Sequence, residues 1–321
     1  MLEQIRQLKK IELHVHLDGS ASLEAMSQIS NKAIDEIKDD VMAPAKCHNL
    51  SDYLTRFTLP IECMQTKEDL KLIGKKYADY CESQNIIYAE PRFAPNSHTT
   101  KGLTFEEIIE SILEGLRMNK NVKTNLILCM MRGNSFESNC KIIEVAEKFL
   151  GKGVCALDIA GAEDIFPLSD HAKLFDIIRA KNIPYTIHAG ESSSYQEVDL
   201  AMDLGTTRIG HGVLSYQSEE TQNKLINSHV LLEMCPTSNI QTNIIEKYED
   251  HPIKKFLDKG IKLSINTDNK TVSNVSLNEE YLKLHEVLGF TIDDFKKTNQ
   301  YALEFTFLSE EEKEELRAQI I

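Results

Sequence analysis

Ile11-Glu-Leu-His-Val-His-Leu-Asp-Gly-Ser20 begins as a short apolar run and ends in polar residues that are suited to chemistry. Side chains two residues apart on a β-strand point to the same face, so His14 and His16 are expected to aim together. Two imidazoles on one face can share a metal ion. An isolated His-x-His pair also fits two histidines that pack separately, so the metal interpretation needs partners elsewhere in the chain.

The same unit recurs along the sequence: a short apolar run, a polar turn and an amphipathic stretch. The runs cover roughly residues 11–15, 86–93, 124–131, 154–159, 184–188, 207–210, 229–233 and 262–266. Several are β-branched or continuously apolar, as strands buried on both faces should be. The stretch 104–117 starts with a Thr cap and repeats apolar residues at helical spacing.

Eight strands that alternate with helices predict an α/β fold, a single (β/α)₈ TIM barrel domain over residues 1–321. A doubly wound open sheet is the competing architecture. The position of the polar groups favours the barrel, because catalytic groups of a barrel gather where its strands end, at one mouth.

The interval of roughly 17–85, between the first two runs, predicts a helical insertion that acts as a lid over this mouth. Helical patterns cover about 22–34, 51–58 and 67–83. An apolar stripe at i, i+3, i+4, i+7 spacing consists of Leu50, Tyr53, Leu54 and Phe57. The stripe fits core packing and equally fits an apolar gate that excludes water from the site.

Composition narrows the class of function. The formal net charge of −14 and the lack of a dense basic stripe disfavour nucleic acids and anionic membranes as partners. The N-terminus shows no apolar signal segment, and no window reaches the ~18 apolar residues of a membrane span. Seven scattered cysteines without a Cys-x-x-Cys pair are typical of reduced thiols. We therefore expect a cytoplasmic enzyme that acts on a small molecule.

Three further runs end in groups that could complete a metal site. The fifth run ends in His188, followed by Glu191, and the eighth is followed by Asp268. With His14 and His16, they form a set of three imidazoles and one carboxylate that suits one Zn²⁺ ion with an open position for water. The sixth run adds His211 at the same mouth. The fourth run offers no lysine to bridge two metals, which favours one zinc ion per chain.

These motifs resemble the adenosine deaminase family of the amidohydrolase superfamily, over nearly the whole chain. The motifs are His14-Val-His-Leu-Asp-Gly-Ser, Asp158-Ile-Ala-Gly161, His188-Ala-Gly-Glu191, Ile209-Gly-His-Gly, Glu233-Met-Cys-Pro-Thr-Ser-Asn and Ser264-Ile-Asn-Thr-Asp-Asn. No Pro-Cys-x-x-Cys segment is present, which excludes the cytidine-deaminase type of zinc site.

The resemblance implies zinc ligands at His14, His16, His188 and Asp268. It further implies that Glu191 donates a proton to the purine ring nitrogen. In the same family pattern, His211 orients the attacking water and helps to deprotonate it, and His211 and Asp268 steady the attacking oxygen. Substrate contacts would come from His16 and Asp18 to the ribose hydroxyl, from the Gly161 backbone to the purine, and from Asn269.

Asn269 is a departure from the family pattern, because many members carry a second Asp there. That Asp must stay protonated to donate to a purine nitrogen, whereas an amide always has an NH₂ donor. The substitution is compatible with purine binding and leaves the fine specificity open.

The resemblance therefore implies hydrolytic deamination of adenosine, and of 2′-deoxyadenosine, within purine salvage. One alternative is adenine deaminase, although such relatives tend to carry Glu where this chain has Asp18. An AMP deaminase is less well supported, because the chain is short and no phosphate-binding cluster is apparent. The alternative from another class is a non-catalytic nucleoside-binding protein, which would not need to retain both Glu191 and His211.

Overall fold

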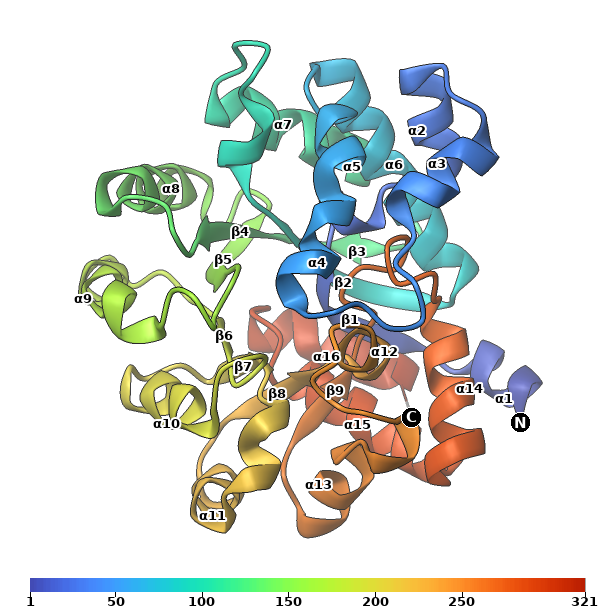
Figure 1. Cartoon of the computed structure of the whole chain (residues 1–321), viewed down its shortest axis with the longest axis vertical. Helices are drawn as coiled ribbons and strands as arrows, with labels where there is room; N and C mark the ends of the chain where they lie inside the picture. The colour runs from blue at the N-terminus through green and yellow to red at the C-terminus, as the bar shows by residue number, and fades with distance from the viewer. Residues whose placement is uncertain (321) are drawn as a thin grey trace.

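In the computed structural model, which describes residues 1–320, parallel strands lie at the centre of the molecule and helices surround them (Figure 1). The strands are β1 (Lys10–His16), β2 (Ile86–Phe93), β3 (Lys123–Thr124), β4 (Leu126–Met131), β5 (Val154–Ala160), β6 (Ile187–Ala189), β7 (Arg208–His211), β8 (Leu231–Met234) and β9 (Leu263–Ile265). Their positions agree with the eight runs of the sequence, except that the run 124–131 is divided between β3 and β4. Asn125 separates these two strands, and its side-chain amide donates to the Tyr88 hydroxyl at 3.1 Å.

Two parallel sheets close into one ring. One sheet has the order β1-β2-β4-β5 with β3 beside β2, and the other has the order β6-β7-β8-β9. Isolated parallel bridges join them at both edges, Leu157 with Tyr185 and Val15 with Asp268. At the first seam Thr186 N donates to Leu157 O at 2.9 Å. The arrangement is a parallel α/β barrel, and the open sheet that competed with it in the sequence analysis is excluded.

The helices before β2 are α1 (Leu2–Gln7), α2 (Leu23–Ser30), α3 (Ile34–Val41), α4 (Leu50–Leu54), α5 (Thr58–Glu62) and α6 (Lys67–Ser83). Those between β2 and β7 are α7 (Phe105–Leu116), α8 (Phe136–Phe149), α9 (Ala172–Ala180) and α10 (Tyr195–Asp203). The remainder are α11 (Glu219–Asn227), α12 (Pro236–Gln241), α13 (Ile253–Lys259), α14 (Leu277–Leu288), α15 (Ile292–Glu304) and α16 (Glu310–Ile320). The expected Thr cap of α7 is present at Thr104, with Glu107 completing a capping box.

The segment between β1 and β2 differs in detail from the helices expected there. The helix expected over 22–34 ends early, because Asn31 ends α2 in a left-handed conformation with φ 57°, and the next helix, α3, starts only at Ile34. The pattern over 51–58 gives α4, a 3₁₀ turn and α5. Helix α6 packs against β2 and α7, so it belongs to the outer ring of the barrel. Its approach to α7 is close, since a Cβ atom on Gly115 would lie 2.1 Å from Lys71 O.

The interior of the barrel is charged below the mouth. Arg92, Arg208, Glu90, Asp158 and Glu233 are fully buried and come from four strands. Such charges are tolerated inside a protein only when they are paired and hydrogen-bonded. Among residues 1–320, no helix combines the length and the apolar character that a membrane span requires.

Candidate active site

A cavity of about 240 Å³ opens where the strands end. Its lining includes the following residues that the sequence analysis singled out: His16, Asp18, Leu50, Tyr53, Leu54, Phe57, Gly161, His188, Glu191, His211, Asp268 and Asn269. His14 does not line the cavity and is fully buried. The fold therefore brings every predicted site residue to one end of the barrel.

The second seam of the barrel places three of the predicted metal ligands. His16 N donates to Asp268 O at 2.6 Å, and Asp268 N donates to His14 O at 3.1 Å. Asp268 has a φ of 60°, a left-handed conformation that is uncommon for a residue other than glycine. The hydrogen bonds that close the ring thus also hold the Asp268 backbone against the first strand.

The imidazoles of His14, His16 and His188 come together, with ligand atoms within 4.8 Å of one another. His16 Nε2 lies 3.2 Å from His188 Nε2 and 3.5 Å from Asp268 Oδ1. A Cβ atom on Gly210 would lie 2.9 Å from His14 Cε1, so this position on β7 has room only for glycine. The buried Nε2 atom of His14 has no hydrogen-bond partner among the described residues. An unpartnered nitrogen within a cluster of imidazoles is what a metal site requires.

Two carboxylates stand behind these imidazoles. His14 Nδ1 lies 2.8 Å from Glu233 Oε2, and His188 Nδ1 lies 2.9 Å from Asp158 Oδ2. Carboxylates in this position orient metal-binding histidines and leave the other ring nitrogen free. Burial alone would raise the pKa of Asp158, but the neighbouring His188 and Arg92 hold it below its usual value.

Arg92 joins the two carboxylates. Its Nη1 lies 2.8 Å from Asp158 Oδ2 and its Nη2 lies 2.7 Å from Glu233 Oε2. Asp158 and Glu233 stand within two of the sequence motifs, but no role was predicted for them or for Arg92. The sequence did offer an indication of their role, because each of these three charged residues lies inside an apolar run that is expected to be buried.

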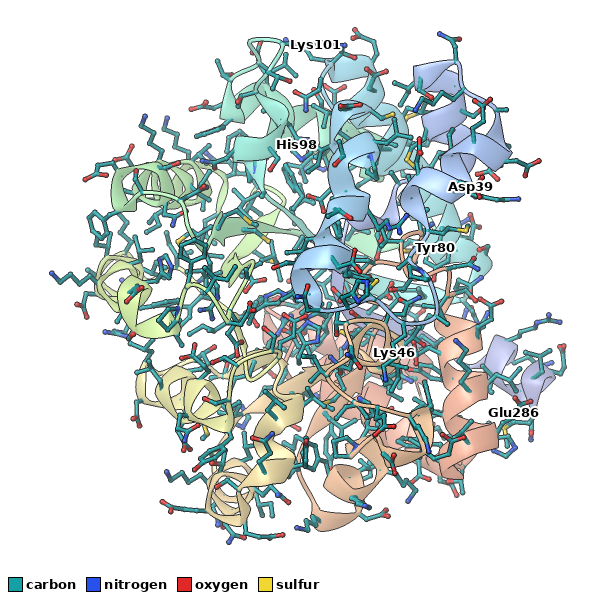
Figure 2. All side chains as sticks on the ribbon, in the orientation of Figure 1. Asp39, Lys46, Tyr80, His98, Lys101 and Glu286 are labelled. Atoms are coloured by element: carbon teal, nitrogen blue, oxygen red, sulfur yellow. The ribbon has the colours of Figure 1, made fainter. Side chains whose placement is uncertain are left out.

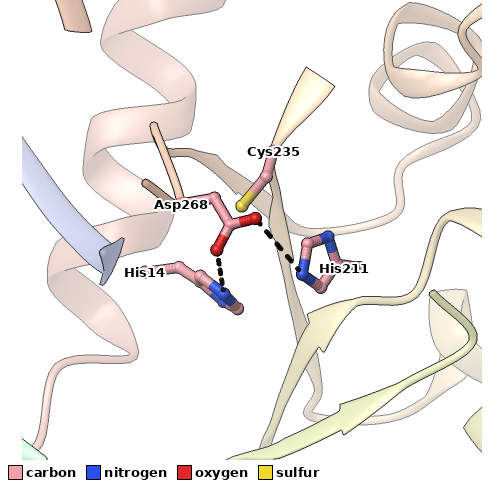
Figure 3. Close-up of side chains that lie close together, drawn as sticks. All are labelled: His14, His211, Cys235 and Asp268. Carbon is pink, nitrogen blue, oxygen red and sulfur yellow. Dashed lines mark ion pairs between the residues drawn. The ribbon is translucent and has the colours of Figure 1, made fainter. Parts of the chain in front are cut away.

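A second grouping of possible ligands contains Cys235 with His14, His211 and Asp268 (Figure 3). Asp268 pairs with His14 at 3.4 Å and with His211 at 3.9 Å. Burial raises the pKa of the Cys235 thiol well above its usual value, and Sγ donates to the Glu233 carbonyl at 3.6 Å. The histidine set is the better candidate, because the thiol hydrogen already has this acceptor, whereas His14 and His188 have carboxylates beside Nδ1.

Glu191 lies beside His211, with 3.5 Å between Oε1 and Nε2. Burial, followed by the charges of Asp268 and Glu163, raises the pKa of Glu191 well above its usual value. The buried Glu163 accepts from Glu191 N at 3.3 Å and from Ser193 N at 3.1 Å. Glu163, which the sequence analysis missed, thus fixes the turn that carries Glu191 and favours its protonated form.

A chain of hydrogen bonds fixes the position of the proton on His211. Ile253 N donates to His251 Nδ1 at 3.3 Å, so the neutral His251 ring carries its proton on Nε2. That nitrogen donates to Asn239 Oδ1 at 3.2 Å, and the Asn239 amide donates to His211 Nδ1 at 3.1 Å. Neutral His211 therefore carries its proton on Nε2, the atom that faces Glu191 and Asp268.

The predicted lid residues also border the cavity. Leu50 and Tyr53 are buried, whereas Leu54 and Phe57 are partly exposed. The Tyr53 hydroxyl is 2.7 Å from Ser273 Oγ, which ties α4 to the loop after β9. The stripe therefore consists of two buried residues, Leu50 and Tyr53, and two partly exposed residues, Leu54 and Phe57.

Comparison with known proteins places these features in a family. The sequence model of the family described as "Adenosine deaminase" matches residues 9–321. An adenosine deaminase of Clostridium perfringens strain 13 is 39% identical over 326 residues, covering 98% of this chain and 98% of that protein.

Two solved structures share the fold. An adenine deaminase from Arthrobacter aurescens has a TM-score of 0.89 at 21% identity, covering 98% of both chains. An amidohydrolase from Burkholderia ambifaria, solved with bound Zn, has a TM-score of 0.88 at 20% identity, covering 99% of this chain and 90% of that one.

Proposed function

The chain belongs to the adenosine deaminase family, and we propose that it catalyses the hydrolytic deamination of adenosine and 2′-deoxyadenosine, with release of ammonia. The observation that carries this proposal is full-length similarity to a curated adenosine deaminase, combined with a protonated Glu191 beside the histidine cluster. The product of adenosine is inosine, as expected for an enzyme of purine salvage.

We propose that His14, His16, His188 and Asp268 hold one zinc ion. The donor set supports this assignment, because two imidazoles have carboxylates beside Nδ1, and His14 Nε2 has no hydrogen-bond partner among the described residues and lies 3.4 Å from Asp268 Oδ1. When bound, zinc supplies a Lewis acid that lowers the pKa of a water molecule.

The protein groups have separate tasks in this proposal. Glu191 carries the proton that must reach the purine ring nitrogen, since protonation makes the neighbouring carbon electrophilic. The donor chain through Asn239 supports His211 as a hydrogen-bond donor that orients the attacking water, rather than as the group that takes its proton. The Asp268 carboxylate, which also accepts from Ser238 Oγ at 2.6 Å, is the acceptor on that side.

Substrate recognition is assigned to His16, Asp18, Gly161 and Asn269, which border one cavity. Asp18 and His16 would meet the ribose, the Gly161 backbone the purine edge, and Asn269 the five-membered ring. The partly exposed Leu54 and Phe57 would form a gate over the purine, within a cover formed by part of the interval 17–85.

Adenine deaminase is the competing function, and its test is direct. The protein is purified, its zinc content is measured, and ammonia release is followed with adenosine and adenine side by side. We expect one zinc ion per chain and release from adenosine. Release from adenine alone would establish the competing function, and release from neither would contradict the enzyme interpretation.

A further inference from the structure

His98 is a buried histidine with no role in the proposed chemistry. It ends the 3₁₀ helix Pro95–His98, which follows β2, and is labelled in Figure 2. Gln65 fixes this segment on both sides of His98, because its amide donates to Ser97 O at 2.9 Å and its Oε1 accepts from Thr100 N at 3.1 Å. The neighbouring Ser97 lines the cavity.

The hydrogen bonds of His98 determine which of its nitrogens carries the proton. Nδ1 lies 3.1 Å from Met64 O, and a carbonyl oxygen can only accept, so the proton is on Nδ1. Burial lowers the pKa of His98 to about 4, so the ring is neutral near pH 7. Nε2 therefore presents a lone pair, and it has no hydrogen-bond partner among residues 1–320.

This lone pair faces Asp18. His98 Nε2 lies 4.0 Å from Asp18 Oδ2, and Asp18 borders the cavity with an exposed fraction of 6%. Gly19 N donates to the other oxygen, Oδ1, at 3.1 Å. Two acceptors thus face each other just behind the cavity wall, which Asp18 lines, and the hydrogen bonds of the described residues include no donor to Oδ2.

An acceptor on a cavity wall that receives no donor from the protein must take its hydrogen bond from a ligand or from solvent. A site of this kind favours a substrate that carries a hydroxyl group, and it rejects an analogue that lacks the hydroxyl because the buried group is then left unpaired. A donor at position 98 would satisfy Asp18 from within the protein and remove this dependence.

We propose that His98 is a specificity-determining, positioning residue: by presenting an acceptor to Asp18, it leaves that carboxylate dependent on a hydroxyl group of the substrate. The inference rests on the proposed deaminase function. It concerns the preference for a nucleoside hydroxyl and not the chemical step.

Two substitutions of His98 separate this role from simple packing. In His98→Gln, the amide nitrogen takes the place of Nε2, so a donor replaces an acceptor opposite Asp18 Oδ2 and the two groups can close the 4.0 Å gap to a hydrogen bond. In His98→Asn, the shorter amide takes the place of Nδ1, donates to Met64 O and ends short of Asp18. The parent and both variants are assayed for kcat and KM with adenosine and with its 2′-, 3′- and 5′-deoxy analogues. The analogue that the parent disfavours most identifies the hydroxyl that Asp18 meets.

We expect the ratio of kcat/KM for adenosine to kcat/KM for that analogue to fall about tenfold or more in His98→Gln, as expected when a charged hydrogen bond loses its role. The fall should come from a higher KM for adenosine with little change in kcat. His98→Asn should keep the ratio of the parent. An unchanged ratio in His98→Gln, or equal changes in both variants for all substrates, would overturn the inference.

If His98→Gln does not fold, His98→Lys tests the same point from the same position, because its ammonium would donate to Asp18 and the ratio should again fall. An intact ratio in His98→Lys would then overturn the inference. A parent enzyme that releases ammonia from none of these nucleosides would overturn the proposed function itself, whereas an active parent with an unaltered ratio in the variants overturns the inference alone.

Discussion

Arg92→Met tests whether the charged interior of the barrel serves the metal site. The Arg92 guanidinium is fully buried and bonds Asp158 Oδ2, Glu233 Oε2 and the Leu13 carbonyl. Its removal leaves two buried carboxylates short of a partner. Breaking a buried ion pair from one side costs about 3–5 kcal/mol of unfolding free energy. With an unfolding entropy of about 2.1 cal/mol/K per residue, this corresponds to a Tm about 4–8 °C lower for a chain of this length.

The same substitution should weaken zinc binding, because it releases the carboxylates that orient His14 and His188. Loss of such supporting contacts lowers metal affinity by roughly 10–100-fold. Thermal unfolding of the metal-free protein measures the first effect, and competition with a chromophoric zinc chelator measures the second.

Arg208→Met is the matched control. Arg208 is also fully buried, but its Nε bonds Glu233 Oε1 at 2.7 Å and its Nη1 pairs with Glu90, so it contacts neither Asp158 nor Glu233 Oε2. We expect a comparable loss of stability with a smaller loss of zinc affinity. The reasoning is refuted if Arg92→Met binds zinc as tightly as the parent, or if Arg208→Met loses as much affinity.

Four further predictions concern the cavity. Glu191→Gln should retain zinc and lose about 10²–10⁴-fold in kcat, since it cannot donate a proton; near-normal turnover would contradict its role. Because Glu191 must be protonated and its pKa is raised, kcat/KM should fall as pH rises through that pKa. Glu163→Gln removes a neighbouring negative charge, so it should lower the pKa of Glu191 and move this fall in kcat/KM to lower pH. An unmoved pH profile would show that the two carboxyl groups act independently. Asn269 cannot titrate, so Asn269→Asp should add an inflection to the pH–rate curve, and superimposable curves would show that no titratable group matters there. Leu54→Ala and Phe57→Ala should raise KM in a stable fold, whereas unchanged kinetics would exclude a gate.

The sequence was sufficient to locate the histidine cluster for a physical reason. Alternation on a strand puts His14 and His16 on one face, and a barrel brings the ends of distant strands to one mouth. His188 and Asp268 follow from the same rule. The prediction required only local periodicity and the closure of the ring.

The supporting contacts could not be predicted in the same way. Arg92, Asp158 and Glu233 come from β2, β5 and β8, and each resembles an isolated charge within an apolar run. Their pairing depends on the register between strands, which periodicity does not specify. The cover of the cavity was also only partly predictable, because the left-handed backbone of Asn31, which ends α2, is a local conformation that apolar spacing does not specify.

Stability alone is a weak reason for a charged barrel interior, because apolar side chains of similar volume often replace buried ion pairs at no cost. The geometry offers a better reason. Arg92 holds the carboxylate oxygens that lie 2.8 Å from His14 Nδ1 and 2.9 Å from His188 Nδ1. With a carboxylate beside Nδ1, each ring is left with Nε2 as the nitrogen for a metal. An apolar interior could fill the same volume, but it could not fix which nitrogen of each ring is left for a metal. The buried charges of Arg92, Asp158 and Glu233 therefore determine which imidazole nitrogens can bind a metal at the mouth of the barrel.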